Sequence, residues 1–265
     1  MLYHYTGIEK LVNILATRRL WLTNISCFKD VHEFTHAVSL LSKELSLSPR
    51  VEQELRSELT RQNDLLFVGC FCSESDRLFL WKEYGGYNIE FAEQDLRAMV
   101  DYQAYMGQVS SYSNLLPCEY DKKRQDRIIT NALSQWKKGG NVIFGKEFSH
   151  LATSFKHPKY CPEQETRLVV QLKNCIAIKT RETDTTITKY WELPLRSYGG
   201  PLPIRSITVG PTRYPEKTIR DLRGSLLAYR LGPVTINHSK IAYQEFIDSQ
   251  RSEMTGRGKT KGGDT

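Results

Sequence analysis

The order of the two hydrophobic periodicities along the chain is the feature that most limits its fold. Apolar residues recur at helical spacing over residues 8–20, and a helical pattern returns over residues 38–63. In the second half, segments with strand character follow one another as ETRLVVQL, CIAIKT, TITKYWELP and IRSITVGP. Because helices dominate the first part and strands the second, the sequence predicts an α+β fold rather than alternating βαβ units.

Glycine, proline and capping residues bound the other expected elements. Residues 1–6 are expected to form a short strand that Gly7 ends, and NDLLFVGCFCSES carries the strongest strand signal in the chain. The helical pattern breaks around Ser48-Pro49, which predicts two helices joined by a turn. The remaining expected elements are helices in SDRLFLWKEYGG, EQDLRAMVDYQ, DRIITNALSQWKKGG and PEKTIRDLRGSLLAYRL, strands in YNIEFA and LLPCEYDK, and a last strand with an extended arm in PVTINHSKIAYQE.

The length and composition of the chain set its domain organisation. With 265 residues, of which 40% are hydrophobic, it can bury a sizeable core. We expect one α+β domain over residues 1–248, with a helical insertion at about residues 38–63. Residues 249–265 hold four cations and two carboxylates, hence +2 of the net charge of +7, and show no apolar periodicity. They are expected to form a basic, disordered tail.

Membrane segments, targeting signals and metal ligands are not evident. The chain has no apolar run of about 18 residues and no signal-peptide pattern at its start, so we expect a cytoplasmic location without membrane contact. The six cysteines are then expected to be reduced. Cys70 and Cys72 are followed by no second Cys or His pair at zinc spacing, and the i, i+4 pair His32 and His36 has no evident third ligand. No metal site is expected.

Common nucleotide-binding and hydrolase motifs are also missing, namely G-x-x-x-x-G-K-[ST], a G-x-G-x-x-G that follows a strand, and G-x-S-x-G. The segments that carry useful chemistry are Tyr3–Thr6, Phe71–Tyr84, Glu163–Arg167, and Thr208–Pro211 with the later Ser239–Ile241. Taken alone, each is more often structural. A histidine in a strand, aromatic residues at helical spacing and a Glu–Arg pair on a strand are all common in ordinary folds.

Together, in order and rough spacing, these segments resemble a bacterial family known as the domain of unknown function 2971. The matching segments run from residue 2 to about 246 and are LYHYTGIEKLVNILATRRLWLT, KDVHE, FCSESDRLFLWKEYGG, EQETRLVV, IRSITVGP and HSKIAY. Lys29 stands where the family usually has Asn, and Thr166 stands where an aromatic residue is usual. The block after Tyr84 is short compared with the family pattern.

The family's layout looks like that of the ADP-ribosyltransferase superfold, an analogy at the level of the fold. This resemblance implies a core of a central split, mixed and antiparallel β-sheet with surrounding helices and a helical insertion. In that superfold a first-strand His, a middle-strand Ser or Tyr and a late-strand Glu line one NAD cleft. His4, Ser73 with Tyr84, and Glu165 occur here in the same order. The implied cofactor is therefore NAD.

The resemblance also implies roles for individual residues. Strand alternation places His4 and Thr6 on one face, where they would bind the adenosine-side ribose, and puts Tyr5 on the other. Trp81 or Tyr84 would stack on the nicotinamide. The residues expected at the cofactor are His4, Tyr5, Thr6, Trp81, Tyr84 and Arg167.

The implied catalytic residues are Glu165, His4 and Ser73. Glu165 would bind the ribose 2′-hydroxyl and stabilise the positive charge that develops when the nicotinamide–ribose bond breaks. Arg167 would orient Glu165 or hold a phosphate. Alternation along a strand would put Glu163 on the same face, so either carboxylate can carry the catalytic role.

Three functions are therefore compared. The first is an NAD-consuming enzyme that transfers ADP-ribose to a macromolecular acceptor, either protein or nucleic acid, as in a bacterial toxin or phage-defence effector. The second is a nucleic-acid-binding or nucleic-acid-cleaving protein, favoured by the basic residues Lys122, Lys123, Arg124, Arg127, Lys137 and Lys138. The third is a non-catalytic, nucleotide-sensing module that contacts a partner subunit or a second copy through residues 38–63.

Overall fold

The computed structural model describes residues 1–28, 38–39, 42–43, 46, 48–110, 113–138, 146–182, 186–195 and 202–257. By packing, the chain divides into two compact units, each built from separate chain segments. Unit 1 comprises Met1–Arg18, Cys72–Glu93 and Gly200–Thr265, and unit 2 comprises Arg19–Phe71 and Gln94–Gly199. The expectation of a single domain over residues 1–248 stays a prediction.

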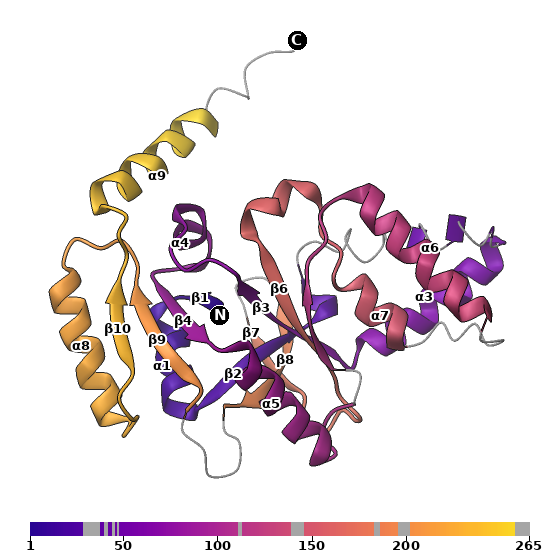
Figure 1. Ribbon diagram of the computed structural model, residues 1–265, viewed down its shortest axis with the longest axis horizontal. Helices are drawn as coiled ribbons and strands as arrows, with labels where there is room; N and C mark the ends of the chain where they lie inside the picture. The colour runs from indigo at the N-terminus through magenta and orange to yellow at the C-terminus, as the bar shows by residue number, and fades with distance from the viewer. Residues whose placement is uncertain are drawn as a thin grey trace. The chain divides into compact units, whose positions relative to one another are not determined.

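Unit 1 is built on strands paired in the order β10–β9–β4–β1 (Figure 1). β1 (Leu2–Thr6) pairs antiparallel with β4 (Tyr87–Phe91), and β4 pairs antiparallel with β9 (Ile204–Val209). β10 (Thr235–His238) pairs parallel with β9, and α8 (Pro215–Ala228) connects the two strands. Unit 1 also contains α1 (Ile8–Thr17), α4 (Leu78–Tyr84) and α9 (Tyr243–Arg257).

Unit 2 contains strands paired in the order β5–β6–β3–β2–β8–β7. Their bounds are β5 (Asn114–Pro117), β6 (Glu165–Gln171), β3 (Leu66–Cys72), β2 (Arg19–Asn24), β8 (Ile187–Pro194) and β7 (Lys179–Glu182). The last residue of β3, Cys72, belongs to unit 1, where it pairs with Tyr3 of β1. Helices of unit 2 are α3 (Pro49–Asn63), α5 (Glu93–Tyr105, which starts at the unit boundary), α6 (Lys122–Lys138), α7 (Lys146–Ala152) and the 3-10 helices η1 (Ile25–Cys27) and η2 (Pro158–Glu163).

The central strands of unit 2 are buried along most of their length. Leu66–Val68 of β3 and Leu168–Val170 of β6 are at most 2% exposed. Side chains of successive strand residues point to opposite faces, so both faces of these strands are covered. This burial explains why their sequences are apolar runs rather than alternating patterns, and each large apolar side chain contributes about 1.5–3 kcal/mol of transfer free energy.

The predicted α+β class is confirmed, since helices pack with a mixed, mainly antiparallel set of strands. The strand predicted at Cys175–Ile178 is wrong, because this segment forms a turn in which Ile178 N donates to Cys175 O. The Asn174 side chain accepts from Ile176 N at 3.1 Å, and Ile176 is 88% exposed. The side chain of Asn174 thus binds a backbone N–H that would otherwise be available to pair with a neighbouring strand. For this reason β7 begins only at Lys179.

The segment after β10 also differs from its prediction, because a helix replaces the expected extended arm. Ile241 and Phe246 pack against a buried cluster of Tyr5, Cys72, Leu80 and Trp81, which anchors the start of α9. The helix continues to Arg257, within the segment expected to be a disordered tail.

Some predictions lie outside the described residues. They concern residues 258–265, the KDVHE segment and the His32–His36 pair. Of the expected helical insertion, α3 covers residues 49–63, and residues 40–41, 44–45 and 47 are likewise outside the described part. Within that part, no helix is both long enough and apolar enough to cross a membrane.

Candidate functional site

The candidate residues fall into two groups, one in each unit. Unit 2 holds a buried ion cluster, defined here as Lys156, Glu163, Glu165 and Arg167. Unit 1 holds a polar hub, defined as Asp76 and the groups that donate hydrogen bonds to it.

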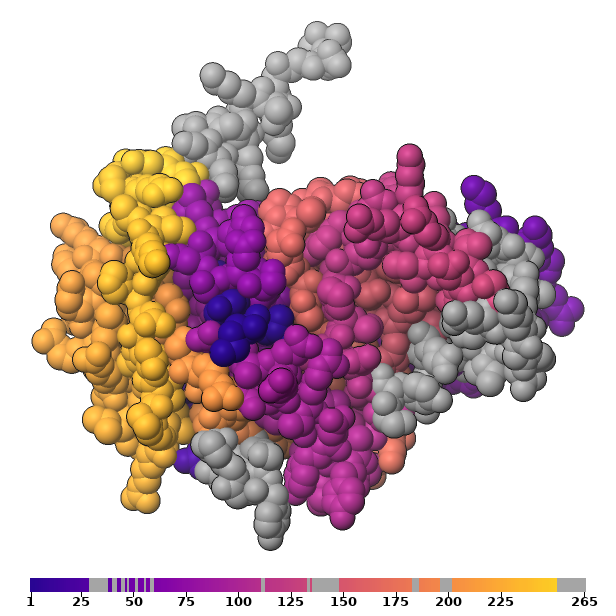
Figure 2. Space-filling view, in the orientation of Figure 1, coloured from indigo at the N-terminus to yellow at the C-terminus, as the bar shows by residue number. Residues whose placement is uncertain are grey.

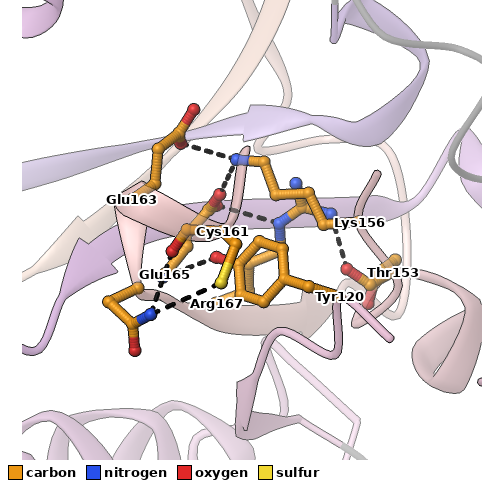
Figure 3. A network of polar contacts seen from close by, with 8 residues as sticks. Tyr120, Thr153, Lys156, Cys161, Glu163, Glu165 and Arg167 are labelled. Carbon is orange, nitrogen blue, oxygen red and sulfur yellow. Dashed lines mark hydrogen bonds and ion pairs between the residues drawn. The ribbon is translucent and has the colours of Figure 1, made fainter. Parts of the chain in front are cut away.

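The ion cluster is a chain of alternating charges, drawn in Figure 3. Lys156 Nζ points between two carboxylates, lies 2.6 Å from Glu163 Oε2 and contacts Glu165 Oε2. The other carboxylate oxygen of Glu165, Oε1, accepts a hydrogen bond of 2.9 Å from Arg167 Nε. All four side chains are at most 8% exposed, so the cluster holds two cations and two anions away from solvent.

Backbone geometry explains how the two glutamates reach the same lysine. Glu165 and Arg167 lie on one face of β6, as strand alternation predicts. Glu163 is not on that strand, contrary to the prediction, because it ends the 3-10 helix η2. Gln164 between them has φ 44°, a left-handed conformation that turns the chain and still leaves both carboxylates at Lys156.

The start of β6 is held in place by its neighbours. Glu165 N donates to the Tyr120 hydroxyl at 2.8 Å, and Cys118 N donates to Glu165 O at 2.9 Å. Arg167 Nη1 donates to Thr153 O at 2.6 Å, so the guanidinium is fixed on a second side. These contacts fix the carboxylate of Glu165 relative to the strand.

Burial and charge act in opposite directions on Glu165. Burial alone would raise its pKa, but the charges of Arg167 and Lys156 and hydrogen bonds from Arg167 and Cys70 outweigh it and lower the pKa from 4.5 to about 2. Glu165 is therefore a carboxylate at neutral pH. In turn, burial would lower the pKa of Lys156, but Glu165 and hydrogen bonds to both glutamates raise it. Burial, followed by the charge of Glu165, raises the pKa of the Cys70 thiol, which stays protonated.

Two aromatic rings complete the surroundings of the cations. Lys156 Nζ lies 5.1 Å from the centroid of the Tyr160 ring, and the Arg167 guanidinium carbon lies 5.5 Å from that of Phe28. Sequence reasoning missed Lys156, which precedes η2 outside the E-x-E-x-R segment. The signal that could have found it is charge balance, because two buried carboxylates need more than one cation.

In unit 1, the polar hub joins segments that are distant in the sequence. The Asp76 carboxylate accepts hydrogen bonds from Trp81 Nε1 at 2.7 Å, Ser239 Oγ at 2.7 Å and Lys240 N at 2.8 Å. The W-x-x-Y block and the S-K-I-x-Y segment thus meet at one carboxylate. The hub links β10 and the start of α9 to α4.

Glycines allow the chain to pass close to this hub. A Cβ atom on Gly210 would lie 2.8 Å from Trp81 Cε3 and 3.1 Å from Gly86 O. Gly210 N also donates to Gly86 O at 2.8 Å. The Gly210-Pro211 step thus needs glycine because the indole of Trp81 fills the space beside it.

The predicted cofactor-binding aromatics differ in exposure. Trp81 is 2% exposed, and its ring meets that of Tyr5 edge to face, with 4.7 Å between centroids. The Tyr5 hydroxyl donates to Glu74 O and accepts from Arg77 N. Both rings are thus packed in the interior of unit 1. Tyr84 is 43% exposed. Of the two residues predicted to stack on the nicotinamide, Trp81 and Tyr84, Tyr84 therefore has the accessible ring.

The face of β1 that was expected to bind the ribose is largely covered. Thr6 is 2% exposed, whereas His4 is partly buried and Ser73 is exposed. The strand neighbour of Thr6 is Tyr87, whose pKa is raised first by burial and then by the charge of Asp221 in α8. His4, Ser73, Trp81 and Tyr84 belong to unit 1, and Glu165 and Arg167 belong to unit 2.

Among the described residues, no group of three or more His, Cys, Asp and Glu side chains is arranged to hold a metal ion. Comparison of the chain with models of protein families, with curated proteins and with solved structures gives no match.

Proposed function

We propose that the chain is an NAD-consuming enzyme of the ADP-ribosyltransferase type, with Glu165 of unit 2 as its catalytic carboxylate. The observation that carries the proposal is the state of Glu165, which is ionised, buried and fixed by contacts on several sides. Side chains whose pKa is strongly perturbed by specific charges are typical of functional sites. The resemblance of the E-x-E-x-R segment supports the same residue.

The chemistry needs a fixed negative charge. When the nicotinamide–ribose bond breaks, its electron pair leaves with the nicotinamide and positive charge develops on the ribose. Glu165 accepts a hydrogen bond from the ribose 2′-hydroxyl and stabilises that charge, as carboxylates do in glycosyl transfer. The acceptor then attacks the ribose carbon and loses a proton. Glu165 is 6% exposed and its Oε2 contacts Lys156, so in this proposal the ammonium of Lys156 moves away from Glu165 when NAD binds.

The two cations give that movement a driving force. In the free protein, Lys156 and Arg167 neutralise Glu163 and Glu165. The pyrophosphate of NAD offers oxygens of the same charge, so Lys156 exchanges a carboxylate for a phosphate rather than losing its partner. When the Lys156 ammonium moves to the pyrophosphate, the Glu165 carboxylate becomes free to bind the ribose. The roles expected of His4, Ser73 and Tyr84 remain predictions.

The test compares two isosteric variants of the same cluster. The full chain is incubated with NAD labelled in the nicotinamide. Release of labelled nicotinamide is followed for wild type, Glu165→Gln and Glu163→Gln. Each variant removes one negative charge beside Lys156, so Glu163→Gln controls for the stability of the cluster. We expect Glu165→Gln to lower the rate by about 10²–10³-fold, the effect typical of losing one charge-stabilising group, and Glu163→Gln to keep most of it. Wild-type protein that neither binds NAD by calorimetry nor releases nicotinamide would refute the proposal.

A further inference from the structure

The β9–α8–β10 segment of unit 1 carries most of the chain's excess positive charge. Between Arg205 and Lys240 the sequence holds seven cations and two carboxylates, a net charge of +5 out of +7 for the whole chain. The cations are Arg205, Arg213, Lys217, Arg220, Arg223, Arg230 and Lys240. All seven are exposed. This concentration lies outside the basic segment around α6 that the sequence singled out.

Helix geometry gathers the central cations on one face. α8 packs against β9 and β10 through an apolar side that includes the buried Leu222 and Leu226. At 100° per residue, Lys217 and Arg220 lie on the opposite side, and Arg223 lies on its flank. Asp221 shares that side and pairs with Lys217 at 2.7 Å, so the cations outnumber the carboxylate there. Figure 2 shows α8 in orange at the surface of unit 1.

The strand topology extends this basic face at both ends. Because β9 and β10 are parallel and α8 returns between them, the start of β9 and the residues after α8 lie at the same end of the unit. Arg205 and Arg230 are therefore at that end, and Lys240 is at the end where α8 begins. The helix itself is about 21 Å long at 1.5 Å per residue, so the cations are spread over an extended surface rather than gathered in a pocket.

A glycine in the middle of the same face is an independent observation. Gly224 lies one turn beyond Arg220 and two turns beyond Lys217. A Cβ atom at Gly224 would have no neighbour within 4 Å, so packing does not require a glycine there. Glycine inside a helix is destabilising, and one of its uses is the close approach of backbone to a ligand. Gly224 lies beside both Arg220 and the Lys217–Asp221 pair, and this bare patch fits a partner that lies directly on the helix.

We propose that this basic face, defined as Arg213, Lys217, Arg220, Arg223 and Gly224, binds the phosphate backbone of a nucleic acid. An extended polyanion matches an extended row of cations, and the phosphates of a duplex are closely spaced. A membrane surface is disfavoured because interfacial helices need a broad free apolar side. In α8, Leu222 and Leu226 are buried, and Leu227 is a single exposed leucine beside the cations. The spread of the cations along the helix favours contacts with the phosphate backbone and no reading of base sequence. The inference does not depend on the proposed function of Glu165.

The test measures salt dependence with the full-length chain. Fluorescence anisotropy follows binding of a labelled 20-base-pair DNA duplex, a single-stranded DNA and a single-stranded RNA of the same length at 50–300 mM KCl. For the duplex, the slope of log K against log salt should become shallower by about 1.8 in Arg220→Gln/Arg223→Gln, at about 0.9 per lost phosphate contact. The matched control is Lys122→Gln/Lys123→Gln on α6, which removes the same charge from exposed positions and should leave the slope unchanged.

Two further arms make the result decisive. Gly224→Glu places a carboxylate in the centre of the face and should weaken duplex binding, and circular dichroism confirms that each variant stays folded. Vesicles with 30% phosphatidylserine replace nucleic acid in a flotation assay. The proposal is overturned if no nucleic acid binds, if the α6 variant rather than the α8 variant changes the slope, or if the chain binds only the vesicles.

Discussion

Replacing Lys156 by methionine tests the ion cluster most directly. Methionine keeps most of the side-chain volume but removes the ammonium, so Glu163 and Glu165 would remain buried with Arg167 as the remaining cation of the cluster. Removing one partner of a buried ion pair costs roughly 3–5 kcal/mol, because the other charge stays uncompensated. Set against a typical free energy of unfolding of about 5–15 kcal/mol, this is a large loss.

The assay is urea unfolding of the full chain, followed by the fluorescence of its four tryptophans. The loss should lower the free energy of unfolding measured in urea. In a thermal unfolding experiment, each kcal/mol lost lowers the melting temperature by roughly 2–4 °C in a protein of about this length. Lys159→Met is the matched control, since that exposed lysine also lies over the Tyr160 ring, at 4.5 Å. It should change the free energy of unfolding by no more than about 0.5 kcal/mol.

Charge balance predicts a rescue that simple loss of packing does not. In Lys156→Met/Glu163→Gln, one cation and one anion of the cluster are gone, and the Glu165–Arg167 pair remains neutral as a whole. The double variant should therefore be more stable than Lys156→Met alone, with a coupling of about 0.5–3 kcal/mol between the two sites. If it is equally or less stable, the argument from buried charge is refuted.

Three other outcomes are expected. The pKa of Glu165 is about 2 in the folded chain and 4.5 without the cluster, so the unfolded chain takes up its proton first as the pH falls. The contribution of Glu165 to stability is therefore full above about pH 5 and is lost as the pH falls towards 2. In acid titrations, the difference in stability between wild type and Glu165→Gln should shrink over this range. Asp76→Ala should lower the free energy of unfolding by roughly 2–4 kcal/mol in urea titrations, because it leaves the buried donors Trp81 Nε1 and Ser239 Oγ without their acceptor; exposed Glu83→Ala serves as the control, and an equal loss there would contradict this role. Gly224→Ala should raise the melting temperature, since alanine stabilises a helix interior by about 0.5–1 kcal/mol and has open space here, whereas a lower melting temperature would reveal an unnoticed contact.

Local patterns in the sequence predicted what depends on a few neighbouring residues. Strand alternation correctly placed Glu165 and Arg167 on one face, and continuous apolar runs correctly indicated β3 and β6. The same rule failed at Glu163 because the left-handed Gln164 interrupts the strand. Periodicity carries no information about such a turn in a residue other than glycine.

Contacts between distant segments could not be predicted in this way. The bond between Asp76 and Ser239 joins residues 163 positions apart, and no periodic pattern connects them. Thr6 was expected beside a ligand, but its side chain is 2% exposed and is covered by other parts of the fold. The sequence of a single strand does not reveal whether its polar face lies against a cleft or against a helix, because the alternating pattern is the same in both cases.

The segmented construction of unit 1 sets the order of events during synthesis. β1 is made first, but its partner β4 follows about 80 residues later, and β9 and β10 follow more than 100 residues after that. At roughly 5–20 residues per second, the first strand waits for about 10–40 s before the chain that completes its sheet has been made. Leu2 and Tyr5, buried in the finished unit, stay uncovered for that period. A ribosome-associated chaperone that binds short apolar segments would therefore find a target in β1 during that period.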